Sequence, residues 1–183
     1  MTDKNTKRGL LLFLLDYFKE VKGRTRIQKM LYLTDKLGWN TITDYYFYQY
    51  GPYSEGLKRE LELLVRHGLI EENEEESTNG NTLYEYKLTP NGSKYLQITN
   101  LGSSELIKKT EQFLEELRRY STADLEIMTS LYHLKKSDPE IDSNERLIKF
   151  VKLYKPWFDE SKIQKNLKVF DLMEKFVEHP TIV

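Results

Sequence analysis

The strongest constraint on the fold is the order of structural signals in the middle of the chain. A helix with leucines at every third or fourth position follows Ser54 and ends at His67-Gly68, where glycine readily takes the left-handed conformation found past a helix end. Two strand-like segments come next, and the polar loop between them, Glu74 to Asn81, contains the turn signal Asn79-Gly80. Thr89-Pro90 then starts another helix, with proline at its first position.

This order is typical of a winged helix-turn-helix. The apolar face of the helix cannot be covered by two other helices alone, so a β-hairpin closes the remaining side and its loop projects as a wing. We therefore expect a winged-helix-like lobe that includes residues 24–98.

The rest of the chain has mainly helical periodicity. One helix is expected from Thr6 to Val21 and a second from Thr25 to Leu37, and four more follow residue 104. The polar connection from Ile98 to Ser104 is the best candidate boundary. The expected fold class is α+β, mostly α, with a winged-helix-like N-terminal lobe (residues 1–100) packed against a helical C-terminal lobe (residues 101–183).

The composition excludes several classes of protein. The 183 residues carry 28 basic and 29 acidic side chains, a net charge of −1, so charge alone would not hold nucleic acid. The absence of cysteine excludes a disulfide scaffold, thiol catalysis and a thiolate zinc site. The longest apolar run, Leu10 to Leu15, is far shorter than the roughly twenty residues that cross a bilayer. We expect a cytoplasmic protein without a membrane partner.

Signatures of catalysis are missing from the sequence. The three histidines, His67, His133 and His179, are far apart, and no two of them are at helical spacing. There is no glycine-rich phosphate loop and no nucleophile elbow. The carboxylates of Glu74 to Glu76 could bind a divalent ion, but such a run is more often only solvated. We expect no enzyme activity, no cofactor and no metal.

A basic segment begins near Arg24, where Arg26 and Lys29 also lie close to the start of a helix. Helix N-termini favour anions, so these cations could contact phosphates; alternatively, they lie in a solvated turn, and Arg24 or Arg26 pairs with Asp44 or Glu20. In a winged helix, the helix after Ser54 would enter the DNA groove. The residues expected to bind nucleic acid in that case are Arg24, Arg26, Lys29, Ser54, Lys58 and Arg59. The glutamates of the wing would repel phosphates, which argues against ordinary duplex binding.

The segment from Tyr45 to Tyr53 is unusually aromatic and has strong β-strand character. In a strand, Tyr46, Tyr48 and Tyr50 share one face, and Gly51-Pro52 is a turn signal. An exposed tyrosine face could stack on bases or anchor a protein partner, whereas core packing is the default interpretation. We expect some of the tyrosines to be exposed. The candidate partner-binding residues are Tyr46, Tyr48, Tyr50 and Tyr53, and Phe47 is the candidate core residue.

These segments together resemble known families. Three segments carry the resemblance: Gly23 to Leu33, the strand from Tyr45, and Gly51-Pro52-Tyr53-Ser54. In the first segment, Lys29-Met30-Leu31-Tyr32-Leu33 is similar to the pattern Lys-x-Leu-x-Tyr-Leu. They are similar to the YwgA-like family and resemble the Panacea or SocA-like antitoxin domain. The resemblance covers roughly residues 5–100.

The resemblance implies a cytosolic, non-catalytic module that in some relatives is an antitoxin holding a toxin by direct contact. It transfers no catalytic residue. We therefore expect a binding protein that acts through contact with a toxin-like or regulatory protein. The alternative is a DNA-binding transcriptional regulator that uses the helix from Ser54 to His67 and the basic residues near Arg24. The oligomeric state is left open.

Overall fold

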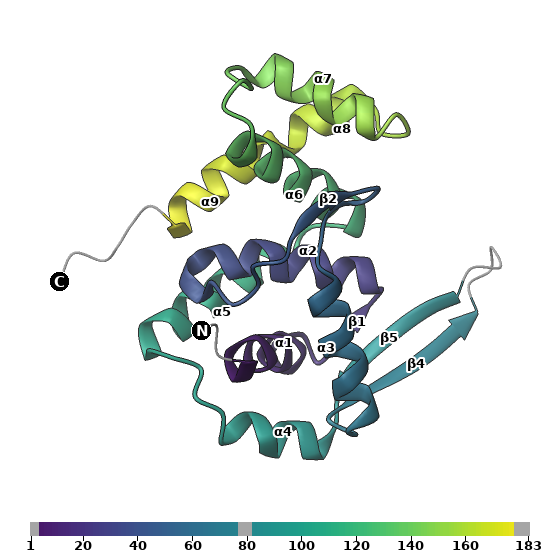
Figure 1. The fold of residues 1–183 in the computed structure, drawn as a ribbon, viewed down its shortest axis with the longest axis vertical. Coiled ribbons are helices and arrows are strands. Elements are labelled where there is room, and N and C mark those ends of the chain that lie inside the picture. Colours follow the sequence, from purple (N-terminus) through teal and green to yellow (C-terminus); the bar gives the residue numbers. More distant parts are fainter. Residues whose placement is uncertain (1–3, 77–81, 178–183) are drawn as a thin grey trace.

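The computed structural model describes residues 4–76 and 82–177, and within them the protein is α+β and mostly helical, as predicted (Figure 1). The helices are α1 (Lys4–Phe18), α2 (Arg24–Thr34), α3 (Glu55–Arg66), α4 (Pro90–Gln97), α5 (Ser104–Arg118), α6 (Thr122–Ser137), α7 (Asn144–Tyr154), α8 (Glu160–Lys165) and α9 (Val169–Val177), with short helical turns η1 (Asp35–Trp39) and η2 (Asn166–Lys168). The strands are β1 (Glu20–Lys22), β2 (Tyr46–Tyr48), β3 (Gly51–Tyr53), β4 (Ile70–Glu76) and β5 (Thr82–Leu88).

The strands β4 and β5 form the predicted hairpin, which extends away from the helices (Figure 1). They are antiparallel, and Ile70 is opposite Leu88. The strand β4 continues to Glu76, so the first glutamates of the expected loop belong to a strand. The predicted turn at Asn79-Gly80 lies outside the described residues, as does His179.

The prediction that the first helix continues to Val21 was wrong. The helix α1 ends at Phe18, and Lys19 has a positive φ of 64° that turns the chain. Val21 then pairs with Tyr86 in the strand β5, so β1 becomes an edge of a three-stranded sheet with the order β1-β5-β4. A three-residue strand is too short to produce a recognisable alternation, which is why the helical pattern prevailed in the sequence.

The helix α1 lies at the centre of the helical array, with α2, α3, α4 and α5 around it (Figure 1). Its apolar run from Leu10 to Leu15 is buried, because partners cover this helix on several sides. The helix α6 packs on α2 and also contacts α7 and α9. One apolar cluster joins side chains of these helices, including Leu33 of α2, Leu114 of α5 and Leu131 of α6.

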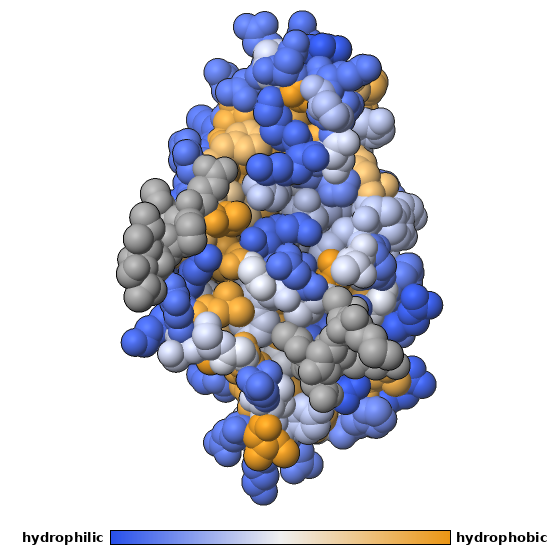
Figure 2. Space-filling view, turned by 60° about the vertical axis from the view of Figure 1, so that its left-hand side comes forward, coloured by the Kyte–Doolittle hydropathy of each residue, from blue (hydrophilic) through white to orange (hydrophobic). Residues whose placement is uncertain are grey.

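The surface is unevenly polar. The face turned forward in Figure 2 is mainly hydrophilic, and its apolar side chains gather in small separate areas. Among the described residues, no helix has both the length and the apolar character needed to cross a membrane.

Candidate functional site

The hairpin of β2 and β3 carries the aromatic segment. Tyr46 pairs with Tyr53, and Tyr48 pairs with Gly51, so the turn is formed by Gln49-Tyr50. The expectation that Gly51-Pro52 forms the turn was therefore wrong, since both residues belong to β3. Two strands of three residues are not stable alone, and this hairpin depends on contacts with the rest of the fold.

Buried side chains from two distant parts of the chain support the hairpin. The Lys29 ammonium group, on α2, donates to the carbonyl of Pro52 at 2.7 Å. Lys155 donates to the carbonyl of Gln49 at 3.1 Å and to the Glu126 carboxylate at 2.7 Å. One carbonyl of β3 and one of the turn are thus bonded to buried lysines, which leaves the side chains of the hairpin available for other contacts.

The end of the hairpin is fixed in a second way. The Gln28 amide group donates to the carbonyl of Ser54 at 2.9 Å and accepts from the backbone N–H of Ser54 at 3.1 Å. Ser54 is the N-cap of α3, and its hydroxyl accepts from the N–H of Leu57 and donates to Asp44. Hydrogen bonds at the buried Ser54 therefore help to fix α3 relative to the hairpin.

The buried cluster of Lys29, Lys155 and Glu126 contains two amines and one carboxylate. Burial lowers the pKa of Lys29 to about 7, and the charge of Lys155 adds to the effect, whereas Glu126 opposes it. Burial also lowers the pKa of Lys155, against the effect of its bond to Glu126. A neutral Lys29 can still donate to Pro52, and the cluster then has one positive and one negative charge.

We expect the stability of the fold to increase with pH because of Lys29. In the unfolded chain its pKa has the ordinary value of 10.5, so between about pH 7 and 10.5 the unfolded chain binds a proton that the folded chain does not. The free energy of unfolding therefore rises with pH in this window, and the contribution is lost as the pH falls toward 7. The slope is at most about 1.4 kcal/mol per pH unit.

Urea unfolding of the wild type and of Lys29→Met at pH 7, 8 and 9 measures this contribution. The difference in unfolding free energy between the two should change by about 1 kcal/mol per pH unit in favour of the wild type. Lys108→Met, at an exposed position on α5, is the control and should follow the wild type. Parallel pH profiles for the wild type and Lys29→Met would contradict the depressed pKa.

The structure brings the four candidate tyrosines to one place. The ring of Tyr53 lies 5.8 Å from that of Tyr46 and 5.9 Å from that of Tyr48, measured between centroids, and the rings of Tyr46 and Tyr48 are 6.0 Å apart. Tyr50 lines the same pocket as these three. We call Tyr46, Tyr48, Tyr50 and Tyr53 the tyrosine cluster. Tyr46, Tyr48 and Tyr50 are 43%, 53% and 46% exposed, so the expected exposed tyrosines are found.

The opposite side of β2 faces the C-terminal helices. Phe47 is half-buried there, and its ring lies 5.7 Å from His133 and 5.2 Å from Tyr154. Phe47 thus packs beneath the hairpin, although it is less buried than a core residue. The exposed aromatic surface continues past the tyrosine cluster, because the ring of Trp157 lies 6.5 Å from Tyr50 and is itself half-exposed. The sequence reasoning missed Trp157, whose only signal was the Lys155-Pro156-Trp157-Phe158 step.

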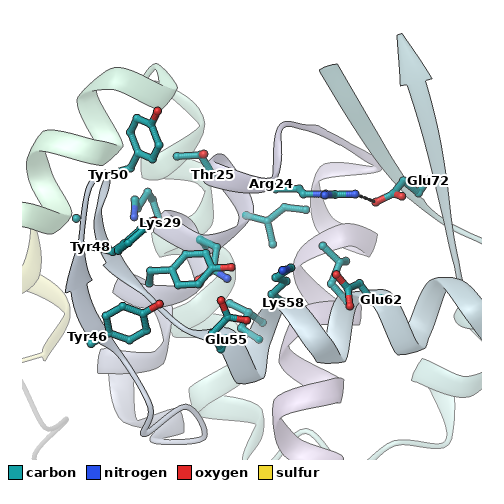
Figure 3. Close-up of a pocket in the computed structure, with 16 residues that line it drawn as sticks. Arg24, Thr25, Lys29, Tyr46, Tyr48, Tyr50, Glu55, Lys58, Glu62 and Glu72 are labelled. Carbon is teal, nitrogen blue, oxygen red and sulfur yellow. Dashed lines mark hydrogen bonds and ion pairs between the residues drawn. The ribbon is translucent and has the colours of Figure 1, made fainter. Parts of the chain in front are cut away.

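A pocket of about 400 Å³ lies beside the tyrosine cluster. In Figure 3, Tyr46, Tyr48 and Tyr50 line one side, Glu55, Lys58 and Glu62 follow α3, and the ion pair of Arg24 and Glu72 closes the far side. Its apolar part comes from Ile27, Leu57 and Leu61. The pocket therefore combines aromatic rings, an apolar floor and charged groups of both signs. Glu55 and Glu62 were not among the site residues expected from the sequence.

The six residues expected to bind nucleic acid do not form one basic surface. Lys29 and Ser54 are buried, so neither can reach a phosphate in this structure. Arg26 donates to the carbonyl of Tyr120. Arg24 donates to Tyr86 and Glu72, and its guanidinium lies 3.8 Å from the centroid of the Tyr84 ring.

Lys58 and Arg59 are the remaining two, on α3, where Arg59 is exposed and Lys58 lines the pocket. The expected pairing of Arg24 or Arg26 with Asp44 or Glu20 is not the one formed, because Arg24 pairs with Glu72. DNA binding through α3 stays a prediction that depends mainly on two cations.

Among the described residues, no group of three His, Asp or Glu side chains is placed to hold a metal ion.

Comparison with known proteins adds one relative and no function. No family model matches the chain. The chain is 30% identical over 114 residues to the uncharacterized protein YwgA of Bacillus subtilis (strain 168). The alignment covers 62% of this chain and 66% of YwgA, slightly less than two thirds of that relative. This similarity supports the YwgA-like resemblance that the sequence motifs indicate.

Proposed function

We propose that this chain is a non-enzymatic, cytoplasmic binding protein that acts through protein–protein contact, as an antitoxin-like or regulatory module. The observation that carries the proposal is the tyrosine cluster, three of whose four residues are exposed on a hairpin held by the buried side chains of Lys29 and Lys155. Exposed apolar residues of this size in one area are unusual unless a partner covers them. Tyrosine is also enriched among the residues that dominate binding energy at interfaces.

The fold that we propose for this role is a winged-helix-like lobe, residues 1–100, packed against a helical lobe, residues 101–183. Its support is the order α1, β1, α2, α3, β4, β5 and the antiparallel sheet β1-β5-β4. The hairpin of β2 and β3 is an addition between the second and third helices of such a lobe. It places the tyrosine cluster beside α3, and winged helices serve as protein-docking modules as well as DNA readers.

Hydrogen bonds from Lys29 and Lys155 hold the backbone of the hairpin in place. A surface that is already fixed loses little conformational freedom when a partner binds, so more of the contact energy appears as affinity. Tyrosine adds to this, because a large ring is ordered by only two side-chain torsions. The antitoxin relation itself is a proposal that rests on the sequence resemblance.

The test is site-specific photo-cross-linking in cells with p-benzoylphenylalanine at position 48, and at position 98 as control. Ile98 is highly exposed but lies far from the hairpin in sequence, at the end of α4. We expect one protein to be captured from position 48 and not from position 98. With that protein purified, Tyr48→Ala should weaken binding about thirtyfold, corresponding to about 2 kcal/mol.

The same change should affect folding by less than about 1 kcal/mol, because Tyr48 is half-exposed. Ile98→Ala should change neither the affinity nor the melting temperature. If position 48 captures no protein, or if Tyr48→Ala binds the captured protein as tightly as the wild type, the hairpin is not the interface.

A further inference from the structure

The pocket beside the tyrosine cluster has a definite electrostatic character. Of its charged groups, Arg24 and Glu72 neutralise each other in an ion pair of 3.1 Å. Glu55, Lys58 and Glu62 form no ion pair within the part of the chain that the structure describes. Lys29 also lines the pocket, but its amine is bonded to the carbonyl of Pro52, and burial lowers its pKa to about 7, so it is mainly neutral above that pH. Two carboxylates then face the one ammonium group of Lys58, and an incoming cation would restore the balance.

The tyrosine rings favour the same sign of charge. Aromatic faces carry partial negative charge and attract cations, guanidinium groups in particular. Burial and then the charge of Glu55 raise the pKa of Tyr53 to about 12, and the same two causes raise the pKa of Tyr46. The carboxylate of Glu55 and the tyrosine rings line the same pocket, so a cation bound there would contact both.

The floor of the pocket suits the stem of a long basic side chain. Ile27, Leu57 and Leu61 are buried under it. Methylene groups of arginine gain free energy when they cover apolar surface while the charged head stays near polar groups. An anion has less support here, because the guanidinium of Arg24 is already engaged with Tyr86 and Glu72.

We propose that this pocket receives an arginine side chain of the partner protein, with its guanidinium between the tyrosine rings and the carboxylates of Glu55 and Glu62. Arginine is preferred to lysine because its planar head stacks on aromatic rings and can pair with a carboxylate through two hydrogen bonds. This inference rests on the proposed function, since it names the partner chemistry of the same surface.

A titration of the ¹⁵N-labelled full chain with Nα-acetyl-arginine amide tests the pocket directly. The matched probe is Nα-acetyl-citrulline amide, which has nearly the same shape without the charge. We expect the arginine probe to shift amide signals of α3 and of the β2–β3 hairpin, and to bind about tenfold more tightly than the citrulline probe. The Glu55→Gln, Glu62→Gln double variant should lose most of this preference.

The control is Glu111→Gln with Glu174→Gln, two exposed carboxylates outside the pocket, which should keep the preference. Equal binding of the two probes, or arginine-induced shifts confined to other regions, would overturn the proposal. A thermal melt of each variant shows that it is folded, so that a lost preference for the arginine probe is not caused by unfolding.

A peptide-display selection separates this inference from the proposed function. Random peptides are selected on the wild type and counter-screened on Tyr48→Ala. Enriched peptides that depend on Tyr48 and share an arginine support both. Peptides that depend on Tyr48 but lack arginine would support the proposed protein-binding surface and contradict the proposal that the pocket binds arginine. Recovery of no Tyr48-dependent peptide counts against the proposed function itself.

Discussion

Replacing Glu126 by glutamine is expected to destabilise the fold by about 3–5 kcal/mol. Glu126 is the only carboxylate that bonds to Lys155 among the described residues, and the Lys155 side chain is fully buried. Glutamine preserves the shape but removes the negative charge, so Lys155 would keep an unpaired buried charge or release its proton. Chemical unfolding at pH 7.5 measures the loss.

Two further variants make this result specific. Asp142→Asn is the same chemical change in an exposed ion pair with Arg146, where the cost should stay below about 0.5 kcal/mol. Glu126→Gln combined with Lys155→Met removes both charges, and it should recover part of the stability, because an apolar side chain carries no desolvation cost. If Glu126→Gln and Asp142→Asn unfold at the same denaturant concentration, the buried cluster does not depend on its charge balance.

The Glu126→Gln change should also affect the proposed binding surface. Lys155 holds the carbonyl of Gln49, in the turn of the hairpin that presents the tyrosine cluster. A variant that disturbs the buried cluster without unfolding the chain is therefore expected to weaken partner binding, although none of its residues is in the proposed interface. The stability of the buried cluster and the position of the hairpin are coupled in this way because Lys155 bonds to both Glu126 and the hairpin backbone.

Local signals in the sequence were sufficient for a large part of this structure. The helix α3, its N-cap Ser54 and the hairpin of β4 and β5 follow from residue types and spacing within about 35 positions. The exposure of Tyr46, Tyr48 and Tyr50 was also predictable, because a short strand cannot bury so many rings on one side. These features depend on neighbours in the chain.

The buried charges could not be predicted in this way. Lys29 and Lys155 are separated by more than a hundred positions, and each looks like an ordinary surface lysine in its own segment. Lysine is almost never fully buried without a partner, and the partner Glu126 lies on a third element. The prediction that Lys29 contacts phosphates was wrong for this reason, because only tertiary packing decides which cations remain at the surface.

The position of the hairpin turn was missed for a related reason. Gly51-Pro52 is a common turn signal, but here Gly51 is needed because the strand lies against α6. Its φ is +86°, and a Cβ atom added to it would lie 2.5 Å from the hydroxyl oxygen of Ser130. The sequence reveals that a glycine is required and cannot reveal which neighbour requires it.

Replacing Gly51 by alanine is accordingly expected to cost about 2–4 kcal/mol of unfolding free energy. Roughly 1–2 kcal/mol arises from placing a side chain at positive φ, and the rest from the contact with Ser130. The Ser130 hydroxyl donates to the carbonyl of Glu126 at 2.7 Å, so it does not move aside without losing that bond. Thermal and urea unfolding of the full chain give the value, and the hairpin should also bind a partner less well.

Two controls separate the backbone effect from the contact. Gly23 has a similar φ of +93° and nothing within 4 Å of an added Cβ atom, so Gly23→Ala should show the backbone cost alone. Adding Ser130→Ala to Gly51→Ala removes the oxygen that the new methyl group meets, and we expect it to recover about 1 kcal/mol or more. If Gly51→Ala is no less stable than Gly23→Ala, or if Ser130→Ala recovers nothing, close packing on α6 is not what requires glycine at position 51.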